Sequence, residues 1–158
     1  MTGRSPAPRI TRAAATLLAL TLLGAACGES GPVPPIGGDQ SLFDRAPDER
    51  IAVALSEFQF DPPTLQLRAG ALTELAIENR GGIEHDFSIR RIEGSQAYHI
   101  NGDPPAVDRR DDQDVHMPLS AGGSGALRIV ATEPGDYELY CSVSGHRRAG
   151  MRTTLTVR

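Results

Sequence analysis

Short runs of alternating hydrophobic and polar residues fill the chain from residue 51 onward, and Gly, Pro and Asn separate them. Alternation with a period of two is typical of a strand with one buried face. The runs predict strands at 51–60, 64–68, 72–78, 85–92, 127–132, 136–141 and 153–157. At least seven short strands with frequent turn signals predict an all-β sandwich or barrel rather than alternating strands and helices.

Two stretches fit this pattern less well. Within 51–60 the alternation slips after Leu55, which predicts a β-bulge. Residues 93–114 are polar and contain Asn-Gly and Pro-Pro, so they predict a long excursion from the sandwich, with a short helix as an alternative. We expect His99 and His116, which lie near this Asp-rich sequence, to be solvated surface residues, and the acidic run 108–114 to be a solvated loop face.

The N-terminus has the layout of an export signal. Three arginines precede an apolar run over 13–23, and small residues occupy 24–26. A positive segment, a short apolar segment and small residues at a cleavage site are typical of a secretory signal, and the run is shorter than the ~20 residues that a membrane-spanning helix needs. A buried core helix is the alternative, but it gives no reason for this order. We therefore expect residues 1–26 to be a signal peptide.

Cys27 follows directly, and the segment 22–27 resembles a bacterial lipobox, although Gly24 stands where that pattern usually has Leu. The resemblance implies that Cys27 is acylated and anchors the protein to a membrane; ordinary cleavage is the alternative. The expected location is the outer face of the cytoplasmic membrane or the periplasm of a bacterium. Loss of residues 1–26 removes three Arg and no acid, so the formal charge changes from −4 to −7.

The segment between the signal and the strands is rich in Gly, Pro, Asp and Glu and has no apolar period. This composition is typical of a disordered or extended tether. We expect 27–50 to be a flexible linker and 51–158 to be the folded domain. An N-terminal strand-swapped arm around Leu42 and Phe43 is the alternative.

Composition and charge exclude several classes of function. All 16 basic residues are Arg, the formal net charge is −4, and no basic cluster is present, which argues against nucleic acid as a partner. Two Cys are too few for a disulfide scaffold. Aromatic residues make up only 4% of the chain, and Trp is absent, so Val, Ile, Leu and Ala must form most of the core.

The candidate chemistry lies at the end of the predicted strand 136–141. Cys141 ends this strand, and the loop after it presents His146 and Met151 with four residues in each gap, while His85 opens another strand after a Gly-Gly turn. One thiolate, two imidazoles and one thioether are the ligands of a blue-copper site. Such a mixed set suits both Cu(I) and Cu(II), so little has to move when an electron arrives. The thiol must lose its proton to bind, so binding releases protons.

Each residue also has a simpler interpretation. Cys141 alone would usually be a buried free thiol, or it could form a disulfide with Cys27. A single His or Met would more often fill the core or the surface. The four together favour a metal site, and a relict that has lost its metal is the remaining alternative.

The stretch YCSVSGHRRAGM followed by TTLTV resembles the C-terminal signature of the cupredoxins, the family of plastocyanin, azurin, auracyanin and rusticyanin. The spacing Cys-x₄-His-x₄-Met is most similar to that of auracyanin and rusticyanin, and the resemblance covers 51–158. It implies a Greek-key β-sandwich and one type 1 copper ion. The implied ligands are His85, Cys141, His146 and Met151. Asp86 and Ser144 depart from the family, whose members often carry Asn and Pro there.

One type 1 site without a second redox or hydrolytic constellation predicts a carrier of single electrons between redox partner proteins. We expect a monomer and no enzymatic activity, with Arg147 and Arg148 forming a positive rim that steers an acidic partner. The alternative is a copper-handling protein, a chaperone or scavenger that delivers copper to an extracytoplasmic oxidase. The low Met content argues against it, because handling sites are usually Met- and His-rich. A sensory or accessory interaction domain is a third possibility.

Overall fold

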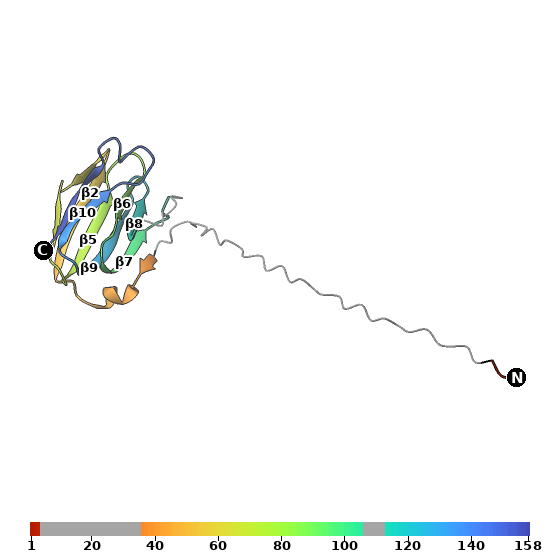
Figure 1. Ribbon diagram of the computed structural model, residues 1–158. Coiled ribbons are helices and arrows are strands. Elements are labelled where there is room, and N and C mark those ends of the chain that lie inside the picture. The colour runs from red at the N-terminus through yellow and green to blue at the C-terminus, as the bar shows by residue number, and fades with distance from the viewer. Residues whose placement is uncertain (4–35, 106–112) are drawn as a thin grey trace.

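The computed structural model describes residues 1–3, 36–105 and 113–158, and the folded part is a sandwich of two β-sheets (Figure 1). The first sheet has six strands, in the order β1 (Ile36–Gly38), β7 (Gly94–Asn101), β9 (Ser124–Ala131), β5 (Leu72–Asn79), β2 (Glu49–Ser56) and β3 (Gln59–Asp61). The second has five, in the order β4 (Leu65–Leu67), β11 (Arg152–Val157), β10 (Gly135–Tyr140), β6 (His85–Ile89) and β8 (Val115–Leu119). The predicted all-β sandwich is confirmed.

The chain crosses from one sheet to the other between successive strands from β5 to β10. Most neighbouring strands are antiparallel, but β2 pairs with β5, and β4 with β11, in parallel. These crossings bring β6 beside β10, although some 50 residues separate them, with Tyr140 opposite Ser88. The beginning of β6 and the end of β10 therefore lie at the same end of the sandwich.

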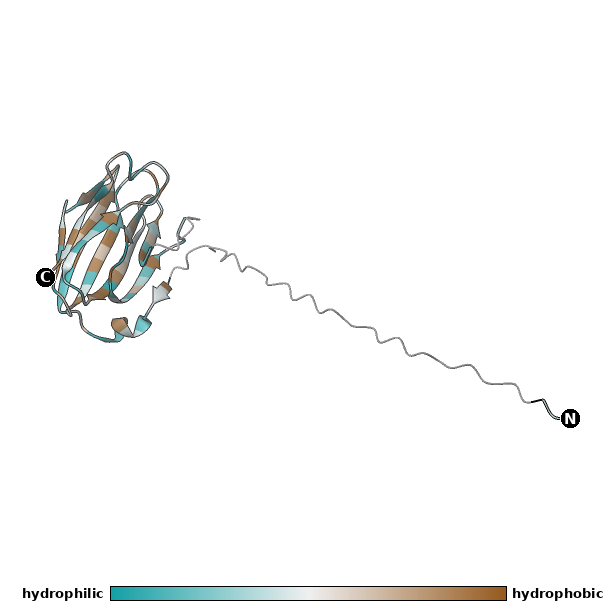
Figure 2. Cartoon of the chain, viewed as in Figure 1, coloured by the Kyte–Doolittle hydropathy of each residue, from teal (hydrophilic) through white to brown (hydrophobic). Residues whose placement is uncertain are grey.

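The core lies between the sheets and follows the alternation in the sequence. Along β5, Leu75 and Ile77 are buried while Ala76 and Glu78 are exposed, and Figure 2 shows hydrophobic and hydrophilic residues alternating along the strands. Phe87 and Leu139 of the second sheet belong to the same buried cluster. All five residues of β6 are buried, so polar side chains on this strand need partners inside the protein.

The alternation slip in 51–60 is a hairpin turn, and the predicted bulge is wrong. β2 ends at Ser56, β3 begins at Gln59, and these two residues are opposite each other. Glu57 and Phe58 form the turn, in which Phe58 has a φ of 63°.

The predicted excursion over 93–114 is also wrong for much of its length. β7 lies inside the first sheet between β1 and β9, where Ala97, Tyr98 and Ile100 are buried. β8, which follows this segment, pairs with β6 in the second sheet. Asp114 is exposed and Gln113 is buried; the rest of the acidic run, at 108–112, lies outside the described residues.

Residues 36–50 belong to the folded domain, whereas the sequence predicted a linker through residue 50. β1 pairs with β7, and the 3-10 helix η1 (Gln40–Asp44) places Leu42 against Leu72 and Ala97. The arm around Leu42 and Phe43 thus packs on the sheet of its own chain. Its contacts come from strands far along the sequence, so composition alone could not reveal them.

The remaining N-terminal predictions concern residues that are not described. Positions 4–35 contain most of the predicted signal 1–26, the lipidation site Cys27 and the first part of the linker. Among the described residues, no helix has the length and apolar character to span a membrane.

Candidate metal centre

The second sheet brings the four predicted ligands to one end of the sandwich. His85 is the first residue of β6, Cys141 directly follows β10, and Met151 directly precedes β11. The loop 141–151 is closed at its base, because the Cys141 amide donates to the Met151 carbonyl at 3.0 Å. The Met151 amide donates to the His146 carbonyl, also at 3.0 Å. The loop therefore folds back on itself and keeps its three candidate ligands close together.

His85, Cys141 and His146 form a tight buried group. One candidate ligand atom from each lies within 4.8 Å of the other two. Cys141 Sγ is 3.4 Å from His146 Nδ1, and the two imidazole rings are 5.0 Å apart between centroids. His85 and Cys141 are fully buried, while His146 retains 8% exposure. Met151 is fully buried in the same core cluster as Cys141.

The electrostatics of these groups fit a metal centre. Burial lowers the pKa of His85, and the neighbouring His146 acts in the same direction, so the His85 imidazole is neutral at pH 7. Neither ring nitrogen of His85 has a hydrogen-bond partner among the described residues, which is unusual for a buried polar group. Burial raises the pKa of the Cys141 thiol to about 12, and the Asp86 carboxylate adds to the effect. Unpaired neutral imidazole and buried sulfur are donors that suit copper.

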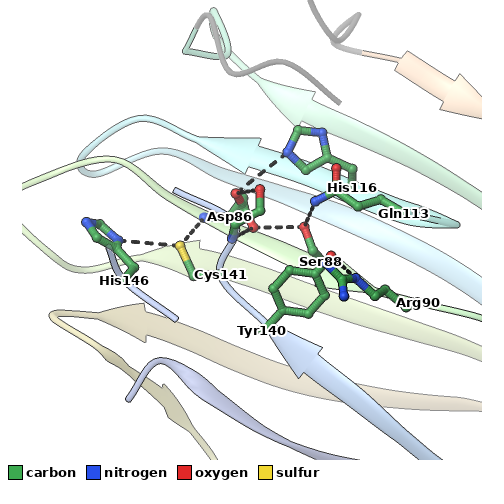
Figure 3. A network of polar contacts seen from close by, with 9 residues as sticks. Asp86, Ser88, Arg90, Gln113, His116, Tyr140, Cys141 and His146 are labelled. Carbon is green, nitrogen blue, oxygen red and sulfur yellow. Dashed lines mark hydrogen bonds and ion pairs between the residues drawn. The ribbon is translucent and has the colours of Figure 1, made fainter. Parts of the chain in front are cut away.

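Asp86 ties the strand of His85 to the loop of Cys141. Its carboxylate accepts hydrogen bonds from the Ser142 amide at 2.8 Å and the Ser142 hydroxyl at 2.6 Å. The Ser88 hydroxyl donates to the same carboxylate at 2.8 Å, and the Asp86 amide points at Cys141 Sγ at 3.4 Å (Figure 3). Although Asp replaces the Asn that the resemblance led us to expect, it joins the two ligand segments directly.

His116 faces Asp86 from β8, and the prediction that it is a solvated surface residue is wrong. It is buried, and its Nε2 lies 3.6 Å from Asp86 Oδ2 (Figure 3). His99 is half-buried on β7, where its ring stacks on Phe43 with centroids 4.0 Å apart. Neither histidine lies in the His85–Cys141–His146 group. The alternation of β8 could have predicted a strand, but nothing local to His116 indicates a partner 30 residues earlier.

The expected positive rim is reduced by an ion pair. Arg147 makes a two-bond contact with the Glu138 carboxylate, at 2.9 and 2.5 Å, and its guanidinium lies 4.9 Å from the Tyr140 ring centroid. Its charge is therefore compensated within the protein. Arg148 is exposed.

Two residues near the histidines were not predicted. Glu57 accepts a hydrogen bond from the Gly82 amide at 2.7 Å, in the turn that leads to His85. The Phe58 ring meets the His146 ring edge-on, with centroids 5.2 Å apart and an interplanar angle of 85°. The only signal in the sequence was the slip in alternation after Leu55. It indicated an irregular backbone but not the contacts of this turn with the histidine segments.

Several solved structures share this arrangement of strands, while no family model matches the chain. Auracyanin B superposes with a TM-score of 0.55 at 22% identity, covering 82% of this chain and 95% of that one. Auracyanin from Roseiflexus castenholzii gives 0.55 at 20% identity, with 72% and 99% covered. A copper-containing nitrite reductase from Thermus scotoductus gives 0.52 at 16% identity, with 75% and 33% covered. The protein is therefore a cupredoxin by fold, as its C-terminal motif predicted.

A curated relative is the copper-resistant cuproprotein CopI of Rubrivivax gelatinosus, which is 30% identical over 109 residues. The match covers 68% of this chain and 66% of CopI, just under two thirds of that protein's length. The fold, the His-Cys-His group and this relative together support copper as the metal.

Proposed function

We propose that this protein binds one copper ion at a type 1 site formed by His85, Cys141, His146 and Met151, and that it passes single electrons between partner proteins. The carrying observation is the tight buried group of His85, Cys141 and His146, whose candidate ligand atoms lie within 4.8 Å of one another. Two imidazoles and a thiolate with a weak thioether form the ligand set of electron-transfer copper sites.

Copper would supply the one-electron redox chemistry, and the protein's residues fix the geometry around it. His85 and His146 offer ring nitrogens, Cys141 gives up its thiol proton on binding, and Met151 offers its thioether from the end of the loop. Asp86 holds the Cys141 loop against β6 through Ser142. A site held on both sides by hydrogen bonds relaxes little when its charge changes, which favours rapid electron transfer.

Partner contact is proposed at the same end of the sandwich. His146 is the only one of the four candidate ligands that is not at 0% exposure. Phe58, which touches it, and Ile83, two residues before His85, are large apolar side chains exposed by 41% and 44%. Exposed apolar residues next to the ligand with the most solvent contact support docking of a protein partner there. In this proposal the protein acts as a monomer and does not convert a substrate.

Copper handling is a second candidate function, because the relative CopI is named as a copper-resistant cuproprotein. Under this hypothesis the site would take up copper and release it to another protein. The deep burial of Cys141 and Met151 favours retention of the metal over exchange. We further propose that the protein is exported and anchored through an acylated Cys27, which would place either function outside the cytoplasm.

Two rates measured on the copper-loaded full-length protein separate these functions. Electron transfer predicts fast reversible oxidation and reduction together with slow loss of copper to an excess of chelator. Copper handling predicts slow oxidation and reduction together with fast loss of copper to the chelator. Slow redox cycling with rapid copper loss would overturn the electron-transfer proposal.

A further inference from the structure

The turn between β2 and β3 lies over the histidines of the metal centre. Phe58, its second residue, places its ring edge-on against His146, with 5.2 Å between centroids. Glu57, its first residue, accepts a hydrogen bond from the Gly82 amide just before His85. This turn belongs to the first sheet, whereas all four candidate ligands belong to the second sheet or its loops. It therefore reaches across the end of the sandwich to touch both histidine segments.

Phe58 has an unfavourable backbone conformation and an unfavourable exposure. Its φ of 63° is in the left-handed region, which residues other than Gly, Asn and Asp rarely occupy. Its side chain is 41% exposed, so it is not a core residue. A hairpin turn has no need of a large apolar side chain at such a position. Strained residues of this kind occur preferentially at functional sites, and the ring's contact here is with a candidate copper ligand.

Glu57 anchors the turn in place. Its carboxylate holds the Gly82 amide at 2.7 Å, and this hydrogen bond lowers the pKa of Glu57, so the carboxylate remains charged at pH 7. The neighbouring Gly81 lies close to both Glu57 and His85. A Cβ added at Gly81 would be 2.9 Å from His85 Nε2 and 3.0 Å from Glu57 Oε1. A second hydrogen bond, from Gln59 Nε2 to the Ser56 hydroxyl at 3.1 Å, closes the base of the turn. These two hydrogen bonds hold the turn, and with it Phe58, beside His146.

We propose that Phe58 controls access to the metal centre by shielding His146 from solvent. The ring packs perpendicular to the imidazole of the least buried candidate ligand, and that ligand keeps only 8% exposure. Small molecules that attack the imidazole, and chelators that compete for the metal, must displace this ring first. The consequence for copper rests on the proposed function, whereas the shielding itself concerns the protein alone.

Chemical modification of the metal-free full-length protein tests the shielding directly. Diethyl pyrocarbonate modifies exposed imidazoles, and peptide mass spectrometry gives a separate rate for each histidine. Phe58→Asn removes the ring while tolerating a positive φ, so we expect the His146 rate to rise several-fold and the His99 rate to stay unchanged. Phe58→Tyr keeps a ring and should restore the wild-type rate at His146.

The chain offers a matched control in Phe43, whose ring stacks on His99 with centroids 4.0 Å apart. Phe43→Ala should raise the rate at His99 and leave the rate at His146 unchanged. An unchanged His146 rate in Phe58→Asn would overturn the proposal. A parallel rise at His99 in that variant would also overturn it, since it would indicate a loosened fold instead of a lost shield.

A copper experiment extends the test to the loaded protein. Phe58→Asn should lose copper to a chelator several-fold faster than wild type while its visible spectrum is kept. Equal rates of copper loss would contradict control of access to the metal. If the modification rates behave as expected but neither protein gives a type 1 spectrum, the shield stands and the proposed copper function fails.

Discussion

Asp86 joins the two segments that carry candidate ligands. Its buried carboxylate accepts three hydrogen bonds, two of them from Ser142 beside Cys141. It also acts on the thiol electrostatically, because its negative charge helps to raise the pKa of Cys141. The residue thus positions the loop. Its charge also favours the protonated thiol in the metal-free protein, so the metal must displace that proton when it binds.

Asp86→Ala should destabilise the metal-free protein by about 2–4 kcal/mol, because hydrogen bonds to charged groups are worth about 1.5–3 kcal/mol each and the Ser142 donors would lose their acceptor. Asp86→Asn keeps an acceptor oxygen and should cost less. Urea unfolding of both variants measures the difference. Equal stability of Asp86→Ala and wild type would show that the carboxylate does not hold the loop.

Copper affinity should rise with pH because of Cys141. Its thiol has a pKa of about 12, so it is protonated at pH 7–9 and must release one proton for each copper bound. The apparent affinity should therefore increase about tenfold for each pH unit in this range. His85 does not oppose this trend, because its lowered pKa leaves it neutral there.

Competition with a chelator of known pH dependence, measured at several values between pH 7 and 9, gives this slope. An affinity that does not change with pH in this range would mean that the thiol is already ionised in the metal-free protein.

At the scale of elements, the N-terminal arm is held by one arginine of β9. Arg128 donates to the carbonyls of Leu42 and Arg45 at 2.8 and 2.6 Å and pairs with Glu74 at 2.6 Å. Its side chain is only 10% exposed, and its guanidinium lies over the Phe43 ring, 4.6 Å from the centroid. The arm is therefore packed on the first sheet as part of the folded domain.

Arg128→Ala should lower the free energy of unfolding by about 2–4 kcal/mol, since two carbonyls of the arm and the half-buried Glu74 carboxylate would lose a charged donor. Hydrogen exchange of residues 36–45 should become faster. Arg50→Ala is the matched control, because Arg50 pairs with the same Glu74 at 3.0 Å but its side chain is 67% exposed. Exposed ion pairs contribute about 0–1 kcal/mol, so this variant should unfold almost as wild type does. Similar losses in the two variants would contradict the anchoring role.

These elements also show why the sequence predicts some parts of the fold and misses others. β5 and β10 are predictable because apolar and polar residues alternate along them. β7 begins with Gly94, Ser95 and Gln96, whose polarity hides a strand inside a sheet. The arm was missed because its anchor Arg128 lies 86 residues after Leu42. Contacts over such separations leave no local pattern.

The same reasoning applies to the candidate site. Its candidate ligands are predictable because three of them lie on one loop at characteristic spacing, while donor chemistry and the family resemblance pointed to His85 as the fourth. Asp86 was visible only as a departure from a family pattern. The contacts of His116 and Phe58 depend on which strands become neighbours, and this information appears only once the two sheets are assembled.

At the scale of the whole molecule, the sandwich places the N-terminal arm and the metal centre at opposite ends. Figure 1 shows η1 at the lower end of the domain and the C-terminal ligand loop at the upper end. An anchor attached through the N-terminus would thus leave the histidine end free to face partners. This orientation suits the proposed lipid anchor.

Acylation of Cys27 has a direct test. Mass spectrometry of the mature protein from its native host should find an N-terminus at Cys27 that carries fatty acyl groups. A mature protein that still begins at Met1, or one cleaved elsewhere without a lipid, would contradict the anchor while leaving the metal centre unaffected.

The most direct test of the copper site is a visible absorption and electron paramagnetic resonance spectrum of the copper-loaded full-length protein. A type 1 site predicts an intense visible band from thiolate-to-copper charge transfer and a narrow copper hyperfine splitting. Cys141→Ser should lose the band, and Met151→Leu should keep it while the reduction potential rises, because a weak axial donor is lost. A wild-type protein without the band, or a Cys141→Ser variant that stays blue, would contradict a type 1 copper site with Cys141 as its thiolate ligand.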